Sequence, residues 1–500
     1  MKLSNNIFRS YSLICIAITC TMYMTLLSVT IHAQQKTNII IINTDDWGYG
    51  DLSCLKELAD IKTPNIDQLA ANGIRFSEGY VTAPQCSPSR AGLLTGRYQQ
   101  RFGFNEIPDG PLPLTETTIA GRLQAAGYMT GIVGKWHLDP NPLSYAWYRE
   151  FFPTAKLVDD KRFRDKRYPA APLHLRLPYL PYARGFTKYF FGEINQYYAN
   201  YSIDNKKVPL TGSFFQQEGY RIEIQTKAAL KFINEHYDQP IFLYLSYFGP
   251  HTPLQAPERY LHLFPGKMPE RRRYALAMMY AIDKGVGTVM DRIKQLGIAD
   301  NTLVFFLSDN GAPLGITMQD NNLKDISGWD GSLNKPLLGE KGMLTEGGIR
   351  VPFIASWPKK YPKGKVMNIP VSTLDIMPTV LEAAGIGLSG DEDGINLTPY
   401  VTQQPGAYPQ RYFFWRFWNQ SAVRHGKWKY ISLSNQHQFL FEIDKDPSEQ
   451  NNVLARYPDI AKSLKQRLEA WSADLVPAGL PADDIRVSEK QWYDHYLNVR

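Results

Sequence analysis

The sequence predicts an α/β protein with a mostly parallel sheet and helices on both faces, followed by a smaller C-terminal α+β domain. Three observations predict this fold. Four short, continuously apolar segments are typical of strands buried on both faces. Amphipathic helical segments precede three of them, as the crossover connections of a parallel sheet require. Beyond about residue 400, short aromatic runs indicate antiparallel strands instead.

The first predicted strand, 37–43, contains four consecutive isoleucines at 39–42. The later strands of the parallel sheet and the helices before them are predicted at 118–126 and 129–133, 225–237 and 241–247, and 274–296 and 303–307. The C-terminal domain is predicted to contain strands 412–418, 427–433 and 439–443 and a helix near 460–471. We therefore expect a larger domain over residues 34–400 and a C-terminal α+β subdomain with an antiparallel sheet over 401–500.

Residues 1–33 have the order of a secretory signal peptide. Lys2 and Arg9 precede an apolar run over 12–31, and Ala33 offers a small residue for cleavage. The run is long enough that retention as a membrane anchor stays open. Cleavage would leave two of the four cysteines, Cys54 and Cys86, so no disulfide framework is expected. We expect a periplasmic or secreted bacterial protein that depends on its core and on any bound metal.

Polar residues that carry chemistry follow each of the four predicted strands. In open α/β sheets, ligands bind at the carboxyl ends of the strands. Four separate strands therefore deliver carboxylates, a lysine and histidines to one edge of the sheet, which predicts a site there. The residues are Asp45-Asp46, Lys135-Trp136-His137, His251 and Asp309-Asn310.

The acidic members of this set predict a metal centre. Asp45, Asp46, Asp309 and Asn310 offer only oxygen ligands, which suits a hard cation such as Ca²⁺ or Mg²⁺. Zinc would favour histidine or cysteine ligands. The set therefore argues against a two-zinc phosphatase on a similar sheet.

A cysteine motif carries a resemblance to a known family. The segment Cys86-Ser87-Pro88-Ser89-Arg90, with Leu94-Thr95-Gly96-Arg97 after it, resembles the signature of the type I sulfatases, in particular the bacterial polysaccharide sulfatases. The resemblance implies an alkaline-phosphatase-like fold, with 34–400 as the catalytic domain. Further motifs occur in the family's order over nearly the whole mature chain: Asn43-Thr44-Asp45-Asp46, Gly134-Lys135-Trp136-His137-Leu138, Gly249-Pro250-His251-Thr252-Pro253, Ser308-Asp309-Asn310-Gly311, Gly339-Glu340-Lys341-Gly342 and 346–352.

The resemblance implies that Cys86 is oxidised after translation to formylglycine. Its hydrate would attack sulfur to give a formylglycine-sulfate intermediate, and residue 86 would also contact the metal. Arg90 would hold and polarise the hydrate. Among hard cations the resemblance favours Ca²⁺ over Mg²⁺.

The same resemblance implies roles for the basic residues. Lys135 and Lys341 would bind sulfate oxygens and offset their charge. His251, with Lys341 as a possible partner, would protonate the leaving oxygen, a step worth roughly 10²–10⁴-fold in rate. His137 would deprotonate the second hydroxyl and so expel sulfate.

Residues 139–184 predict a basic and aromatic insertion near the site, because the segment is rich in proline, aromatic and basic residues and lacks clear periodicity. Aromatic residues in it could stack on sugars or pack together. Asp139 stands where the family commonly has glycine, so it could touch the substrate pocket or pair with a neighbouring cation. Such aromatic residues include Trp147, Tyr148 and Tyr179, and the basic residues of the insertion include Lys161, Arg162, Arg164, Lys166, Arg167 and Arg176.

We expect hydrolysis of sulfate esters on a sulfated polysaccharide or its oligosaccharides. An algal polymer such as ulvan or carrageenan is favoured, and a glycosaminoglycan comes next. Expected partners are this carbohydrate and a formylglycine-generating or anaerobic sulfatase-maturing enzyme, with no nucleic acid, and a membrane only if residues 1–33 are retained. Two alternatives stay open: a phosphodiester or phosphonate monoester hydrolase on the same fold, and a non-catalytic sulfated-glycan binding protein.

Overall fold

A computed structural model describes residues 36–160, 165–323, 325, 328–402 and 408–499. The compact unit described below is residues 37–500. The predicted signal peptide and the insertion's Lys161, Arg162 and Arg164 lie outside the described residues. Within the described ranges, no helix is both long and apolar enough to cross a membrane.

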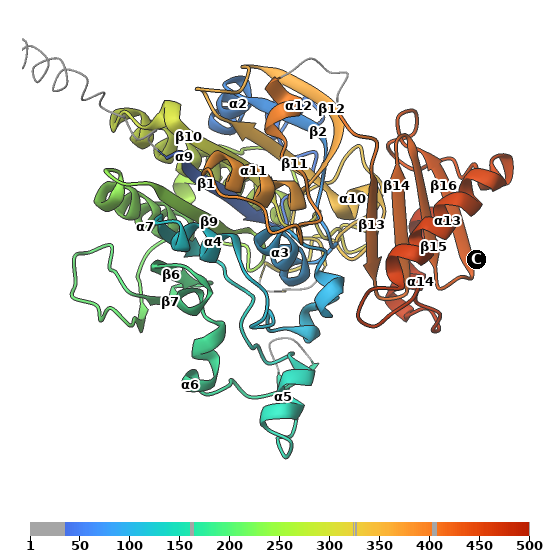
Figure 1. The fold of residues 1–500 in the computed structure, drawn as a ribbon, viewed down its shortest axis with the longest axis horizontal. Helices are drawn as coiled ribbons and strands as arrows, with labels where there is room; N and C mark the ends of the chain where they lie inside the picture. The colour runs from blue at the N-terminus through green and yellow to red at the C-terminus, as the bar shows by residue number, and fades with distance from the viewer. Residues whose placement is uncertain (1–35, 161–164, 324, 326–327, 403–407, 500) are drawn as a thin grey trace, which may run out of the picture. The chain divides into compact units, whose positions relative to one another are not determined.

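A ten-stranded sheet in the order β12-β2-β11-β10-β1-β9-β3-β6-β7-β8 forms the centre of the unit (Figure 1). The five strands β10-β1-β9-β3-β6 run parallel, and both flanks include antiparallel pairs. The four predicted parallel strands are confirmed as β1, β3, β9 and β10. The strands are β1 (Asn38–Asp45), β2 (Ile74–Tyr80), β3 (Met129–Gly134), β6 (Lys188–Gly192), β7 (Gln196–Ala199), β8 (Ser213–Gln216), β9 (Ile241–Pro250), β10 (Thr302–Ser308), β11 (Arg350–Ser356) and β12 (Lys365–Ser372).

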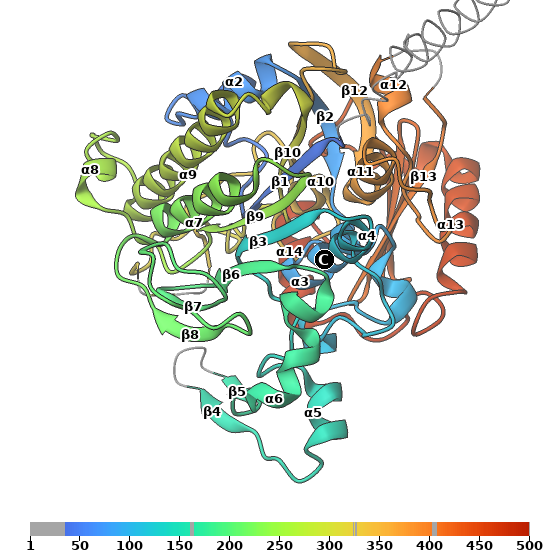
Figure 2. The ribbon, with the colours of Figure 1, turned by 60° about the vertical axis from the view of Figure 1, so that its left-hand side comes forward.

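Helices cover both faces of this sheet (Figure 2). The isoleucine run of β1 shows why: Ile40 and Ile42 pack in a core with α2, α7 and α9, whereas Ile39 and Ile41 pack in a second core with α3, α4 and α11. A strand with two buried faces has no polar side, so its sequence reads as continuously apolar. The helices are α2 (Pro64–Ala71), α3 (Cys86–Thr95), α4 (Ile119–Ala125), α5 (Tyr145–Phe151), α6 (Leu173–Arg176), α7 (Arg221–His236), α8 (Glu258–Leu261), α9 (Glu270–Gln295), α10 (Glu346–Ile349), α11 (Ile376–Ala383), α12 (Thr398–Thr402), α13 (Pro458–Ser472) and α14 (Val487–Leu497).

A second, four-stranded antiparallel sheet lies near the C-terminus, in the order β13-β14-β15-β16. One face packs on α13, and the other packs on Tyr80, Val351 and the loop residues Met343 and Leu344 of the main unit. The predicted α/β fold with a C-terminal antiparallel sheet is confirmed, although β14 was not predicted. The boundary at residue 400 stays a prediction. The strands are β13 (Tyr412–Phe417), β14 (Gln420–His425), β15 (Trp428–Leu433) and β16 (His437–Glu442).

The insertion 139–184 carries α5, α6 and the short strands β4 (Val158–Asp160) and β5 (Asp165–Arg167). Its aromatic residues form a small core of their own, in which the Tyr148 and Tyr168 rings stack 4.4 Å apart. Trp147 and Tyr148 are only 5% and 2% exposed, so these two rings are buried among protein side chains. Packing, and not an open stacking surface for sugars, is therefore their role in the structure.

Candidate active site

The carboxyl ends of the parallel strands bring the predicted site residues together. β1 lies between β10 and β9, and β9 pairs with β3, so the residues after these four strands are neighbours in space. Backbone hydrogen bonds continue the ladder past the strand ends: the amide of His251 donates to the Asp45 carbonyl at 3.2 Å, and that of Asp309 to Thr44 at 3.1 Å. The prediction of a shared edge is confirmed.

Gly134 shows how closely the backbones approach at this edge. It has a φ of +98°, and a Cβ built on it would lie 1.9 Å from the Ser246 carbonyl oxygen. Only glycine tolerates both conditions. The next amide, Lys135, donates to that same oxygen at 2.8 Å, which directs the lysine side chain into the site.

Cys86 is the first residue of helix α3, whose residues are all buried. Pro88 lies in the first turn of this helix, where proline is tolerated, and does not set a separate turn. The Cys86 Sγ lies 3.1 Å from the Lys341 Nζ and 3.5 Å from an Asp45 carboxylate oxygen. A helix N-terminus also favours an anion beside it. Burial raises the pKa of the Cys86 thiol to about 12, so with no cation bound the thiol stays protonated at neutral pH.

The buried carboxylates beside Cys86 fit a hard cation. Oxygens of Asp45, Asp46 and Asp309 lie with the Cys86 Sγ within 4.8 Å of one another. All three carboxylates are at most 2% exposed. The Asn310 Oδ1 is buried without a hydrogen-bond partner among the described residues, so it is available as a fourth oxygen. Burial raises the pKa of Asp309 to about 6 against the effect of Arg90, and the nearby Asp45 carboxylate adds to the rise.

Three buried or half-buried cations surround the carboxylates. The Lys135 Nζ donates to both Asp45 oxygens at 2.8 and 3.0 Å, and the Lys341 Nζ to both Asp46 oxygens at 2.7 and 2.9 Å. Arg90 donates to Asp309 through Nε at 2.8 Å. These carboxylates outweigh the effect of burial and raise the pKa of each cation above its ordinary value. The lysines and the arginine are therefore fixed positive charges next to Cys86.

His251 lies across the carboxylates from Lys135. Its Nδ1 is 2.6 Å from the Thr252 carbonyl oxygen, so Nδ1 carries a proton and Nε2 faces the site, 3.6 Å from Asp46. Burial lowers the pKa of His251 to about 4 despite Asp45 and Asp46. A proton on Nε2 therefore requires added negative charge in the site, such as that of a bound sulfate ester.

His137 follows Lys135 by two residues and interacts electrostatically with Lys135, Arg90 and Asp45. It has a φ of +60°, and its Nδ1 is buried without a hydrogen-bond partner in the described part of the chain. Burial, then the charges of Lys135 and Arg90, lower the pKa of His137 well below its usual value. A neutral imidazole in this position is suited to accept a proton.

Several supporting residues were not predicted from the sequence. Ser246 accepts a hydrogen bond from the Arg90 guanidinium. The Phe248 ring lies between the Lys135 ammonium, 5.2 Å away, and the Arg221 guanidinium, 4.6 Å away, and 5.1 Å from the His251 ring. The buried Arg221 also donates to the backbone carbonyls of His251 and Pro253. Ser246 and Phe248 lie at the end of the third predicted strand, and this position is the feature of the sequence from which they could have been predicted as site residues.

The loop that carries Lys341 is held by the C-terminal region. Gln420 of β14 is fully buried, donates to the Gly342 carbonyl at 2.8 Å and accepts from the Leu344 amide at 2.9 Å. The Trp492 ring of α14 covers Gly342 so closely that a Cβ there would lie 2.4 Å from it. The C-terminal sheet and α14 therefore position one of the site's cations.

Comparison with known proteins decides the family. The model of the family described as Sulfatase matches residues 37–386. The chain belongs to the sulfatase family, as a type I sulfatase. Its residues 338–474 also match the family described as N-sulphoglucosamine sulphohydrolase, C-terminal. This sulfatase is therefore a sulfuric ester hydrolase, and its acidic cluster agrees with the family's general use of a metal.

Named relatives support the same conclusion. The sulfatase is 30% identical to human arylsulfatase A over 90% of each chain. It is 34% identical to human N-acetylgalactosamine-6-sulfatase, over 74% of this chain and 67% of the relative. Among solved structures, that of Ps i-CgsB is similar with a TM-score of 0.71 and 30% identity, over 92% of this chain and 97% of that one.

Three motif residues outside the centre have structural partners in this sulfatase. Arg97 pairs with Glu116 at 2.7 Å. Glu346 binds Arg350 at 3.2 Å and the buried Lys429 at 2.9 Å. These pairs do not include the site residues described above, so Arg97, Glu346 and Arg350 support the structure around the site.

Proposed function

We propose that this sulfatase removes sulfate from a sulfated polysaccharide or its oligosaccharides, with residue 86 acting as formylglycine. Two comparisons support a carbohydrate substrate. Relatives include N-acetylgalactosamine-6-sulfatases, and the similar Ps i-CgsB was solved in complex with k-i-k-neocarrahexaose. An algal polymer such as carrageenan or ulvan is the favoured class, and a glycosaminoglycan comes next.

The observation that carries the proposed mechanism is the convergence of unlike groups on Cys86. A nucleophile position at a helix N-terminus, fixed cations and two histidines lie together at one edge of the sheet. Sulfuryl transfer needs these parts: neutralisation of sulfate oxygens, an acid for the leaving oxygen and a base to free the product.

Formylglycine hydrate at position 86 would supply two geminal hydroxyls. One would lose its proton to solvent and form the new bond to sulfur as the bond to the sugar oxygen breaks, and the other would later give up its proton so that sulfate is released. Lys135 and Lys341 bind the sulfate oxygens, because both ammonium groups already converge on Asp45 and Asp46 beside residue 86. Arg90 orients the hydrate and is itself fixed by Asp309.

Two proton transfers complete the cycle. When the negatively charged sulfate ester binds, His251 takes up a proton from solvent on Nε2. As the bond between sulfur and the sugar oxygen breaks, His251 gives this proton to that oxygen, while Nδ1–H stays hydrogen-bonded to the Thr252 carbonyl. His137 then takes the proton of the second hydroxyl. The electron pair of that O–H bond re-forms the aldehyde as the bond to the sulfate oxygen breaks, and inorganic sulfate leaves.

Asp45, Asp46, Asp309 and Asn310, with residue 86, would hold Ca²⁺. The bound cation would supply positive charge that offsets the sulfate oxygens and the ionised hydroxyl. Before catalysis we expect export through residues 1–33 and maturation by a formylglycine-generating or anaerobic sulfatase-maturing enzyme.

The test is release of sulfate from a panel of sulfated oligosaccharides, measured beside matched phosphate esters. The proposal predicts that at least one sulfated sugar is desulfated with a kcat/KM well above that of its phosphate counterpart. Equal or greater phosphate turnover, or activity on aryl sulfates alone, would overturn it.

A further inference from the structure

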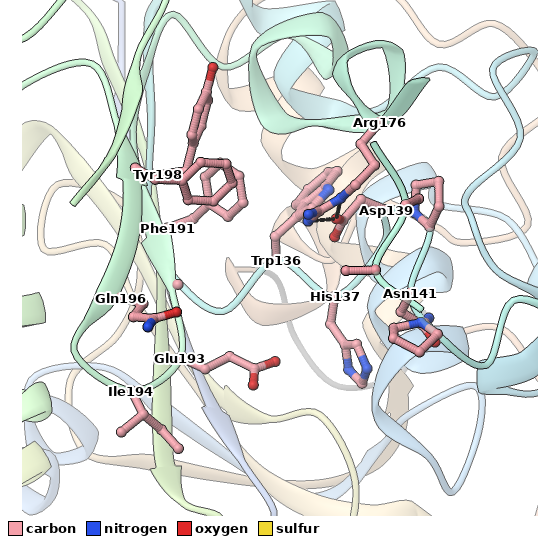
Figure 3. A pocket seen from close by; sticks show the side chains of 16 residues that line it. Trp136, His137, Asp139, Asn141, Arg176, Phe191, Glu193, Ile194, Gln196 and Tyr198 are labelled. Atoms are coloured by element: carbon pink, nitrogen blue, oxygen red, sulfur yellow. Dashed lines mark hydrogen bonds and ion pairs between the residues drawn. The ribbon is translucent and has the colours of Figure 1, made fainter. Parts of the chain in front are cut away.

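A cavity of about 340 Å³ opens beside His137, between the insertion and the β6–β7 turn (Figure 3). The rings of Trp136, Phe191 and Tyr198 line it, and the Trp136 indole is fixed by a hydrogen bond to the Tyr179 carbonyl at 2.9 Å. Pockets for small molecules occupy about 300–1,000 Å³, so this one has room for a single sugar ring. Because it adjoins His137, such a ring would carry the sulfate ester to the site.

The charged groups in this cavity are mostly acidic. Figure 3 shows Glu193 and His137 on opposite sides of it, and Asp139 paired with Arg176. The Asp139 Oδ2 accepts from the Arg176 Nε at 3.1 Å and from its Nη2 at 2.5 Å. Arg176 is the one lysine or arginine among the described residues that line the cavity, and Asp139 neutralises it. The two carboxylates therefore outnumber the single cation.

We propose that this cavity selects a sugar ring with one sulfate and no other charge, a neutral hexose or N-acetylhexosamine, and that Asp139 and Glu193 determine this specificity. The proposal rests on the proposed function, because the ligand is the sugar that carries the scissile sulfate. A second sulfate or a uronate carboxylate on the ring would face Asp139 and Glu193, and the described residues that line the cavity offer no unpaired lysine or arginine to offset it. Repulsion of this kind rejects the wrong substrate without weakening the right one.

The side chain at position 139 decides whether Arg176 is available to a ligand in the cavity. A glycine there would leave the Arg176 guanidinium free to receive a second anion on the sugar. Asp139 instead accepts hydrogen bonds from the Arg176 Nε and Nη2, so the insertion does not present an unpaired Arg176 to a polyanion.

The experiment uses the matured full-length enzyme. Sulfate release is measured from 2-, 4- and 6-monosulfated galactose, from 4- and 6-monosulfated N-acetylgalactosamine, and from the disulfated counterpart of the best of them. We expect the wild-type kcat/KM for the monosulfate to exceed that for the disulfate by about 5- to 10-fold. This is the size expected for repulsion between one added sulfate and a carboxylate when solvent partly screens the two charges. Asp139→Asn frees Arg176 and Glu193→Gln removes the second carboxylate, so each should lower this ratio at least threefold.

Glu218→Gln is the matched control, because Glu218 is exposed and does not line the cavity. It should keep the wild-type ratio. Thermal melting shows whether Asp139→Asn folds, and the exposed Glu193 provides a second, independent variant. Equal turnover of mono- and disulfated sugar by the wild type, or unchanged ratios in both variants, overturns the specificity proposal alone. Activity on 4-nitrophenyl sulfate with no turnover of any sugar overturns the proposed function as well.

Discussion

At the scale of single residues, the two histidines differ in how they are held. His251 has one nitrogen committed to a backbone carbonyl and the other facing Asp46, whereas His137 has a buried nitrogen without a partner among the described residues. This difference agrees with the proposed roles of His251 as the proton donor and His137 as the proton acceptor. It leads to a test based on the leaving group.

Replacement of His251 by alanine should affect substrates according to how much their leaving oxygen needs a proton. We expect kcat/KM for a sugar sulfate to fall roughly 10²- to 10⁴-fold, and that for 4-nitrophenyl sulfate to fall less than about 10-fold. Steady-state kinetics on both substrates measures the difference. His262→Ala, at an exposed histidine directly after α8, is the control. Equal losses on both substrates would exclude His251 as the acid.

The oxygen ligands make a second prediction at this scale. Chelation should abolish activity and lower the Tm, because Asp45, Asp46 and Asp309 are buried close together and lose the cation between them. Added Ca²⁺ should restore both quantities. Rescue by Zn²⁺ alone would contradict a site made of hard oxygen ligands.

At the scale of elements, the Lys341 loop depends on a strand that is distant in the sequence. Gln420→Ala should leave the Gly342 carbonyl and the Leu344 amide unpaired, at a cost of about 1–3 kcal/mol in unfolding free energy for each group. Because Lys341 is proposed to bind sulfate, we also expect inhibition by inorganic sulfate to weaken about 3- to 10-fold. Denaturant unfolding and sulfate Ki are the two measurements.

The control for this variant is Gln438→Ala, at a half-buried glutamine on β16 outside the loop. It should leave the sulfate Ki unchanged. If Gln420→Ala lowers stability but keeps the wild-type Ki, Gln420 supports the fold without positioning Lys341.

The elements also show which parts of the fold were predictable. β1, β3, β9 and β10 are buried on both faces, so their composition alone marks them as strands. The mixed pattern of β2, Ile74–Tyr80, has no such run, and it forms because β11 and β12 pair with it. β14 was missed because it carries Gln420, Ser421 and Arg424, whose polar groups find partners only in the folded protein.

The site residues, like the strands, were predictable only where the local sequence marked them. Residues directly after buried strands were predicted, since a parallel sheet brings strand ends together. Gln420 and Glu193 were not predicted, because their places depend on how the C-terminal sheet and the β6–β7 turn pack. Long-range packing of this kind leaves no local pattern in the sequence.

At the scale of the whole molecule, a buried charge cluster joins the two sheets. Lys429 of the C-terminal sheet binds Glu346 at 2.9 Å and Glu449 at 2.8 Å, and all three side chains are fully buried. Burial, together with the Glu346 carboxylate, raises the pKa of Glu449 to about 7. Against burial, Lys429 and Arg350 lower the pKa of Glu346 to about 2. Lys429 therefore pairs with two carboxylates. Of these two, Glu449 is the one that is protonated first as the pH falls.

This cluster predicts a pH dependence of stability. The folded-state pKa of Glu449 is raised, so its contribution is complete below about pH 4.5 and is lost as pH rises towards 7. The lowered pKa of Glu346 adds a contribution that is constant above pH 4.5. We expect wild-type unfolding free energy to fall between pH 5 and 7.5 relative to Glu449→Gln, measured by urea denaturation. Glu469→Gln, at an exposed position on α13, should track the wild type, and a parallel fall in Glu449→Gln would refute the assignment.

Residue 86 is proposed to act as formylglycine, and mass spectrometry of the peptide that contains it tests this most directly. The fraction of that peptide in which the thiol is replaced by an aldehyde should equal the fraction of active sites titrated in the same preparation, and Cys86→Ala should have no activity. A preparation that is fully active while the peptide carries only unmodified cysteine would contradict the account.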